Sequence, residues 1–182
     1  MSDSLITIFA IFIAAILMFI FPLMAVSERT DDVSQLAVQT ATSEFVDNIR
    51  STGKLTGDAY GKFVETIAAT GNSYDVEMQI QVLDENPGKK TTQVNSTKIG
   101  ENVYYNIYTT QILDIIAPED SSKTARPYYL KEGDIVSVSV KNTNTTISQL
   151  LRNFFYQIAG NDTYQIAASY AGMVMVNGSN RK

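Results

Sequence analysis

The sequence predicts an α+β protein, in which a long N-terminal transmembrane-plus-amphipathic helix packs on a small, mainly antiparallel sheet with one or two further helices. Three observations support this. The chain opens with a continuous apolar run, a helical amphipathic pattern follows it directly, and two later segments alternate apolar with polar residues. Because helices repeat every 3.6 residues and strands every two, these periods separate the two kinds of element.

The apolar run extends from Leu5 to Val26, and Thr7 is its one polar residue. A hydrocarbon layer about 30 Å thick is crossed by roughly 20 helical residues. Residues 1–27 are therefore interpreted as a transmembrane anchor that spans the lipid bilayer once. A short N-terminal tail and a polar, acidic remainder favour an N-terminus inside the cell and an extracytoplasmic domain over residues 28–182.

A cleaved signal peptide is the alternative interpretation of this segment. Ala25 and Ser27 are small residues of the kind that precede a signal-peptidase site. A signal peptide, however, has a basic start and a shorter apolar stretch, whereas Met1 to Ser4 contains no Lys or Arg. We therefore expect a permanent anchor.

The helix is predicted to continue past the membrane. After Glu28, apolar residues recur mostly every three or four positions, as in an amphipathic helix: Val33, Leu36, Ala37, Ala41, Phe45 and Ile49. Residues 28–52 are thus expected to continue the anchor helix and form one wall of the domain, and Gly53 is expected to end it. Pro22 removes a hydrogen bond to Met18, so we expect a bend or break near residues 18–22.

The rest of the chain alternates between helical and extended patterns. We predict a helix at about 57–70, capped by Thr56, and a half-buried strand at about 74–82. A turn at 86–89 and a returning strand at about 91–99 follow, and 103–116 is predicted to form a short strand that leads into a helix. The remaining elements are a loop at 118–126, a second clear strand at 135–140, an amphipathic helix at 146–160 and a last strand at 164–176 with a bulge at Gly172.

The composition excludes several function classes. The 182-residue chain has no Cys and no His, which removes thiolate or imidazole zinc sites, disulfides, and Ser-His-Asp or Cys-His catalysis. Its net charge of −5 at pH 7 argues against a nucleic-acid partner. It contains neither a glycine-rich phosphate loop nor a calcium-loop motif. We therefore expect no catalytic residues, no metal site and no cofactor.

The layout of Leu5–Val26, the amphipathic continuation Val33–Ile49 and a C-terminal sheet domain resembles a pilin-like or pseudopilin-like subunit of prokaryotes. It is closest to the TadE-like minor pilins of tight-adherence (Flp) systems, and Pro22 is similar to the proline in many pilin stems. The chain has no basic leader and no acidic residue between Ser4 and Ser27. The resemblance implies a role in the assembly of a cell-surface filament or secretion machine, and these two departures from the type IV pilin pattern favour an uncleaved accessory subunit over the major pilin.

Helix packing supplies a mechanism for such assembly. Ala10 and Ala14 lie four residues apart and so share one face of the anchor, where small residues allow helices to approach closely. The expected partners are the lipid bilayer, other copies or pilin-like subunits, and an assembly platform. The alternative is a membrane-anchored binding or sensory module, with a pocket lined by Tyr104, Tyr108 or Tyr128. An anchored hydrolase that uses carboxylates or a Ser-Lys pair is a third interpretation.

Overall fold

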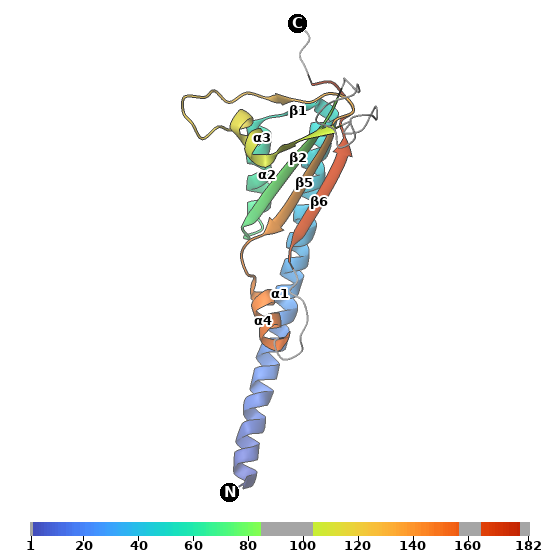
Figure 1. The fold of residues 1–182 in the computed structure, drawn as a ribbon. Helices are drawn as coiled ribbons and strands as arrows, with labels where there is room; N and C mark the ends of the chain where they lie inside the picture. The colour runs from blue at the N-terminus through green and yellow to red at the C-terminus, as the bar shows by residue number, and fades with distance from the viewer. Residues whose placement is uncertain (1, 85–103, 157–164, 179–182) are drawn as a thin grey trace, which may run out of the picture.

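The computed structural model describes residues 2–84, 104–156 and 165–178. The predicted turn at 86–89, the strand at 91–99 and the helix end at Gly160 lie outside these residues. Among the described residues, the chain forms one long helix with a small α+β domain at its C-terminal half (Figure 1). This agrees with the predicted fold class.

Helix α1 extends without interruption from Ser2 to Thr52 and includes Pro22. The chain does not break at Pro22: Figure 1 shows α1 continuing past this residue as one helix, so this part of the prediction is wrong. The proline removes only one hydrogen bond of the helix, and prolines are tolerated in membrane-type helices where local adjustment satisfies the freed carbonyl. Gly53, with φ of +64°, ends the helix. A side chain there would also collide with the backbone oxygen of Val176.

Two of the other helices match the predicted ranges closely. Helix α2 spans Gly57–Ala68, and the hydroxyl of Thr56 accepts a hydrogen bond from the amide of Ala59 at 3.2 Å. Helix α3 spans Thr109–Ile116 and follows a short strand directly, as the ambiguous segment 103–116 was predicted to fold. The hydrogen bond at Thr56 confirms the prediction that this residue caps the start of α2.

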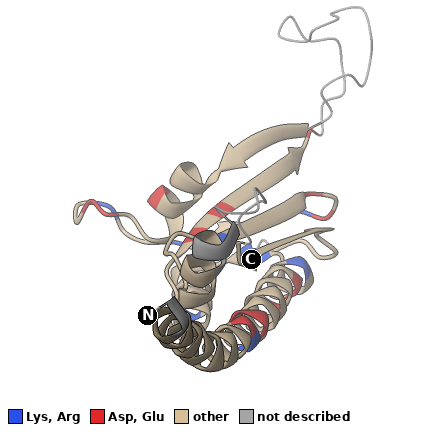
Figure 2. Cartoon of the chain, turned by 90° about the horizontal axis from the view of Figure 1, so that it is seen from below, with Lys and Arg blue, Asp and Glu red and all other residues tan. Residues whose placement is uncertain are grey.

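A four-stranded antiparallel sheet packs against these helices in the order β3-β2-β5-β6. Its strands are β2 (Tyr74–Leu83), β3 (Tyr104–Tyr108), β5 (Ile135–Asn142) and β6 (Ala167–Met173). Strands β1 (Lys54–Leu55) and β4 (Tyr128–Tyr129) form a separate short pair. Viewed from below, α1 lies along one side of the sheet (Figure 2). The other side exposes polar residues, so the domain has two layers.

The hydrophobic core lies between the sheet and helices α1, α2 and α3. Its largest fully buried side chains come from all of these elements: Ile49, Leu55, Ile67, Ile80, Ile112, Ile116 and Val138 are among them. The outer half of α1 is therefore part of the domain as well as the continuation of the apolar segment. This is the wall that the sequence predicts.

Strand β6 is attached to α1 at both of its ends. The amide side chain of Gln35 exchanges two hydrogen bonds with the backbone of Ala167, and Arg50 Nε donates to the carbonyl of Met173 at 2.9 Å. Gly172 pairs in regular register with Val136, so the predicted bulge is wrong. A Cβ at Gly172 would collide with the Arg50 side chain where it now lies, so a larger residue here would have to displace Arg50.

Helix α4 (Ile147–Tyr156) lies below the sheet, beside the middle of α1 (Figure 1). The sequence predicts a strongly amphipathic helix here, with Ile147, Leu150, Leu151, Phe154, Phe155 and Ile158 as its apolar residues. The helix forms, but Ile147 and Leu150 are exposed, and Ser148 and Gln149 are buried instead. The sequence pattern thus identifies the two sides of α4 and does not show which one contacts the protein.

Candidate helix-packing surface

The outer half of α1 has a buried side that contacts its own domain. The buried residues recur every three or four positions and include polar as well as apolar side chains: Asp31, Ser34, Val38, Ala41, Thr42, Phe45, Val46 and Ile49. Two of the predicted packing residues, Phe45 and Ile49, lie on this side. Phe45 stacks on Phe63 of α2, with ring centroids 4.4 Å apart.

The polar residues on this buried side each have a hydrogen-bond partner. Ser34 Oγ donates to the carbonyl of Thr30 at 2.9 Å, and Thr42 Oγ1 donates to the carbonyl of Val38 at 2.7 Å. Such bonds to the preceding turn satisfy a hydroxyl within the helix itself. Asp31 accepts a hydrogen bond from Thr146, as described below. Because burial of these groups is compensated, an apolar stripe alone does not define the inward side of α1.

Val33 and Leu36 were expected to share the stripe with Phe45 and Ile49, but they point away from the domain. Each has 65% of its surface exposed, and Ala37 is exposed as well. Together with the exposed Val26, they extend the apolar surface of the span beyond the predicted bilayer. Leu36 lies ten residues after Val26, which corresponds to about 15 Å along the helix.

A groove runs along α1 beside Val33, and we call it the stem groove. Its volume is about 700 Å³. It is lined mainly by small or medium-sized residues of α1 and of the end of α2: Val26, Arg29, Thr30, Val33, Ser34, Ala37, Thr66, Ala69 and Thr70. Small side chains leave room for the close approach of another helix, and an apolar helix laid in a groove is a common mode of recognition.

Leu36 lies at a second concavity on the other side of the exposed sector. This hollow, of about 390 Å³, lies between α1 and β6 and includes Gln39, Thr40, Ala167 and Tyr170 in its lining. The exposed sector of α1 therefore has a hollow on each side. A ridge between two grooves is the surface shape by which helices interlock.

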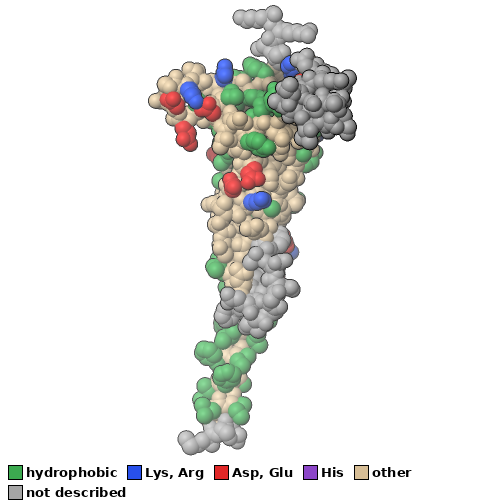
Figure 3. All heavy atoms as spheres, viewed as in Figure 1, with side chains coloured by type: hydrophobic (Ala, Val, Ile, Leu, Met, Phe, Trp, Pro, Cys, Tyr) green, Lys and Arg blue, Asp and Glu red, His purple; other side chains and the backbone are tan. Residues whose placement is uncertain are grey.

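The N-terminal part of α1 is apolar and exposed all round. Among the described residues, α1 is the one helix that is long and apolar enough to cross a membrane. Its most apolar stretch has a mean hydropathy of 2.9. Ala10 and Ala14 are both exposed, and Ala10 lines a shallow hollow of about 430 Å³ with Leu5, Ile6, Phe9 and Ile13. Figure 3 shows apolar side chains gathered around this part of the stem on the face it displays.

The tyrosines named for a binding module lie at the distal end of the domain. On β3, Tyr104 is half-buried and Tyr108 is exposed, and Tyr128 on β4 is half-buried. Burial and the nearby Tyr105 and Asp134 raise the pKa of Tyr128 to about 12. Its hydroxyl therefore stays protonated at neutral pH and can serve as a hydrogen-bonding group.

Among the described residues, no group of three or more His, Cys, Asp or Glu side chains lies close enough together to hold a metal ion. The ion pair between Lys123 and Asp114 is exposed, and that between Arg50 and Asp47 joins a partly buried Arg50 to an exposed Asp47. No protein family, characterised protein or solved structure matched the chain in comparisons of sequence and fold. The surface of α1 is therefore the feature of the molecule that bears on function.

Proposed function

We propose that the protein is a membrane-anchored, pilin-like subunit that takes part in the assembly of a cell-surface filament or secretion machine. The N-terminal part of α1 crosses the bilayer once, with the domain outside the cell. The stems of neighbouring subunits then pack side by side. The observation that carries this proposal is the exposure of Val33 and Leu36 next to the stem groove.

The exposed sector of α1 favours a protein partner in this region. Burial of a Val or Leu side chain contributes about 1.5–3 kcal/mol relative to exposure to water. Val33 lies at the stem groove and Leu36 at the hollow beside β6, so two copies can meet with the Leu36 side of one ridge in the stem groove of the next. Such a head-to-tail contact leaves both outer surfaces free for further copies, and repetition of it builds a filament.

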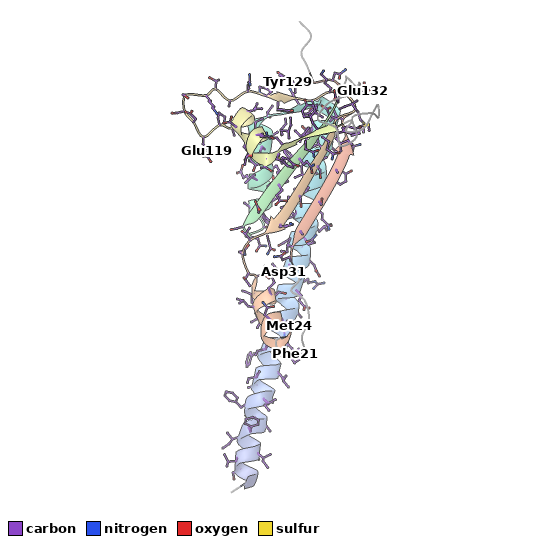
Figure 4. All side chains as sticks on the ribbon, viewed as in Figure 1. Phe21, Met24, Asp31, Glu119, Tyr129 and Glu132 are labelled. Atoms are coloured by element: carbon purple, nitrogen blue, oxygen red, sulfur yellow. The ribbon has the colours of Figure 1, made fainter. Side chains whose placement is uncertain are left out.

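Cysteine crosslinking in intact cells tests this contact, because the chain has no Cys of its own. We expect Val33→Cys and Leu36→Cys to give crosslinked dimers or higher species. Val46→Cys, whose position is fully buried, and Glu119→Cys, in an exposed loop of the distal end (Figure 4), should stay monomeric. Equal crosslinking at Glu119 and at Val33 would contradict packing through the stem.

Detergent extraction provides a second test of the same proposal. We expect the full chain to be extracted from membranes as oligomers. A chain without residues 1–27 should be a soluble monomer, because the span that concentrates and aligns the stems has been removed. Monomers in both preparations would exclude assembly, and full-length chain found in the soluble fraction would exclude the anchor.

A further inference from the structure

In its first turn, helix α4 places polar side chains toward the protein and apolar side chains outward. Ser148 and Gln149 have only 2% and 7% of their surface exposed, whereas Ile147 and Leu150 have 60% and 59% exposed. This is the reverse of a helix on the surface of a water-soluble domain, which places its apolar stripe on the core.

Buried hydrogen bonds fix this orientation. Thr146 Oγ1 donates to Asp31 Oδ2 of α1 at 2.8 Å, and both residues are buried. The amide of Gln149 donates to Thr146 Oγ1 at 3.2 Å, and the amide of Thr146 donates to Gln149 Oε1 at 3.0 Å. These reciprocal bonds form a capping box that starts α4. The capping box ties Thr146 to the first turn of α4, and rotation of α4 about its axis would break the bond from Thr146 to Asp31, so the outward direction of Ile147 and Leu150 is part of the fold.

The position of α4 along α1 is at the end of the predicted span. Asp31, which holds the start of α4, follows Val26 by five residues, or about 7.5 Å along the helix. From there α4 runs back toward the N-terminal end of α1 (Figure 4), where Met24 and Phe21 lie beside its lower end. Its ten residues cover about 15 Å. The helix therefore reaches past Val26, alongside the apolar span.

Both the orientation and the position have a common explanation in a lipid environment. Apolar side chains facing acyl chains, with polar groups bonded inside the protein, are what the membrane requires. The sequence of α4 contains no carboxylate and one basic residue, a charge pattern that is compatible with lipid headgroups. The exposed surface of Ile147 and Leu150 also continues that of the span next to it.

We propose that the outward side of α4 docks on the lipid bilayer, at the interface beside the emerging α1. The inference rests on the anchoring that the proposed function includes, and it adds a second membrane contact to the span. One helix alone leaves a domain free to rotate about it and to tilt. With α4 on the bilayer, the domain holds a set height and inclination, so the stem groove of every copy meets its neighbour at the same level.

Depth-dependent fluorescence quenching tests this docking on the full chain. Single-Cys variants are labelled with a small fluorophore and reconstituted in phosphatidylcholine vesicles, with or without brominated acyl chains. Phe12→Cys in the span reports anchoring. We expect Ile147→Cys and Leu150→Cys to lose a fraction of their fluorescence comparable to that of Phe12→Cys. Met175→Cys has the same 59% exposure as Leu150 but lies near the distal end of α1, and it should lose none.

The outcomes separate this inference from the proposed function. Quenching at Phe12 without quenching at Ile147 and Leu150 overturns the docking of α4 and leaves the anchor in place. Absence of quenching at Phe12 overturns the anchor and with it the docking. Disulfide-linked dimers through Leu150→Cys without lipid quenching show that a second copy covers α4, which also overturns the inference. Unchanged far-ultraviolet circular dichroism of each variant verifies that the labelled chains are folded.

Discussion

Helices α2 and α4 both pack against α1, yet they turn opposite sides to it. Helix α2 buries Phe63 and Ile67 in the core, as expected for a helix surrounded by water. Helix α4 buries Ser148 and Gln149 and exposes Ile147 and Leu150. Both sequences are amphipathic. The difference teaches that amphipathicity defines two sides of a helix and does not by itself determine which of them faces the protein.

The largest expected effect comes from the core residue of α2. Phe63→Ala removes the ring that stacks on Phe45, and we expect a loss of about 3–5 kcal/mol in the free energy of unfolding, because a cavity remains. Leu150→Ala should change that free energy by about 0.5 kcal/mol or less in detergent. Chemical unfolding followed by circular dichroism measures both. A large loss for Leu150→Ala would mean that α4 packs through its apolar side after all.

The next effect concerns the buried hydrogen bond that holds α4. Asp31→Ala leaves the Thr146 hydroxyl without this partner in a buried site, and we expect about 1–3 kcal/mol of destabilisation. The neighbouring Asp32 is exposed, so Asp32→Ala is the matched control and should be nearly neutral. Limited proteolysis should then cut near α4 sooner in Asp31→Ala than in Asp32→Ala. Equal effects of the two variants would show that the bond does not hold the helix.

The smallest effect is expected at the N-cap of α2. Thr56→Ala removes the acceptor for the Ala59 amide and should cost about 1 kcal/mol in the free energy of unfolding. Thr56→Ser keeps a hydroxyl and should restore most of the lost stability. If Thr56→Ser is as unstable as Thr56→Ala, the methyl group rather than the cap accounts for the change. Thr146→Ala should exceed Thr56→Ala, because Thr146 also bonds to Asp31.

Much of the fold can be predicted from the sequence because local signals agree with tertiary packing. The strands β2 and β5, the start of α2, and the strand-to-helix junction at Tyr108 all follow from periodicity or capping. The bulge at Gly172 fails as a prediction because the glycine serves a distant residue: it makes room for Arg50 of α1. No local pattern records a contact across more than one hundred residues.

The candidate surface was predicted less well, for a related reason. The apolar pattern of α1 groups Val33 and Leu36 with Phe45 and Ile49, although the first two point outward. The actual inward side includes Asp31, Ser34 and Thr42, whose hydrogen bonds compensate their burial. Two of these bonds are local, so a Ser or Thr in mid-helix is a signal that could have been weighed. The Asp31 bond comes from α4 and required the tertiary structure.

The attachment of β6 to α1 has a mechanical consequence. Gln35 and Arg50 hold the two ends of this strand, and β6 runs in the same direction as α1, away from the N-terminus (Figure 1). A force applied between the span and the C-terminal end therefore pulls β6 along its own length. The hydrogen bonds to β5 and α1 are then loaded together in shear rather than one after another. A stem built this way can carry tension along its length without peeling its sheet apart.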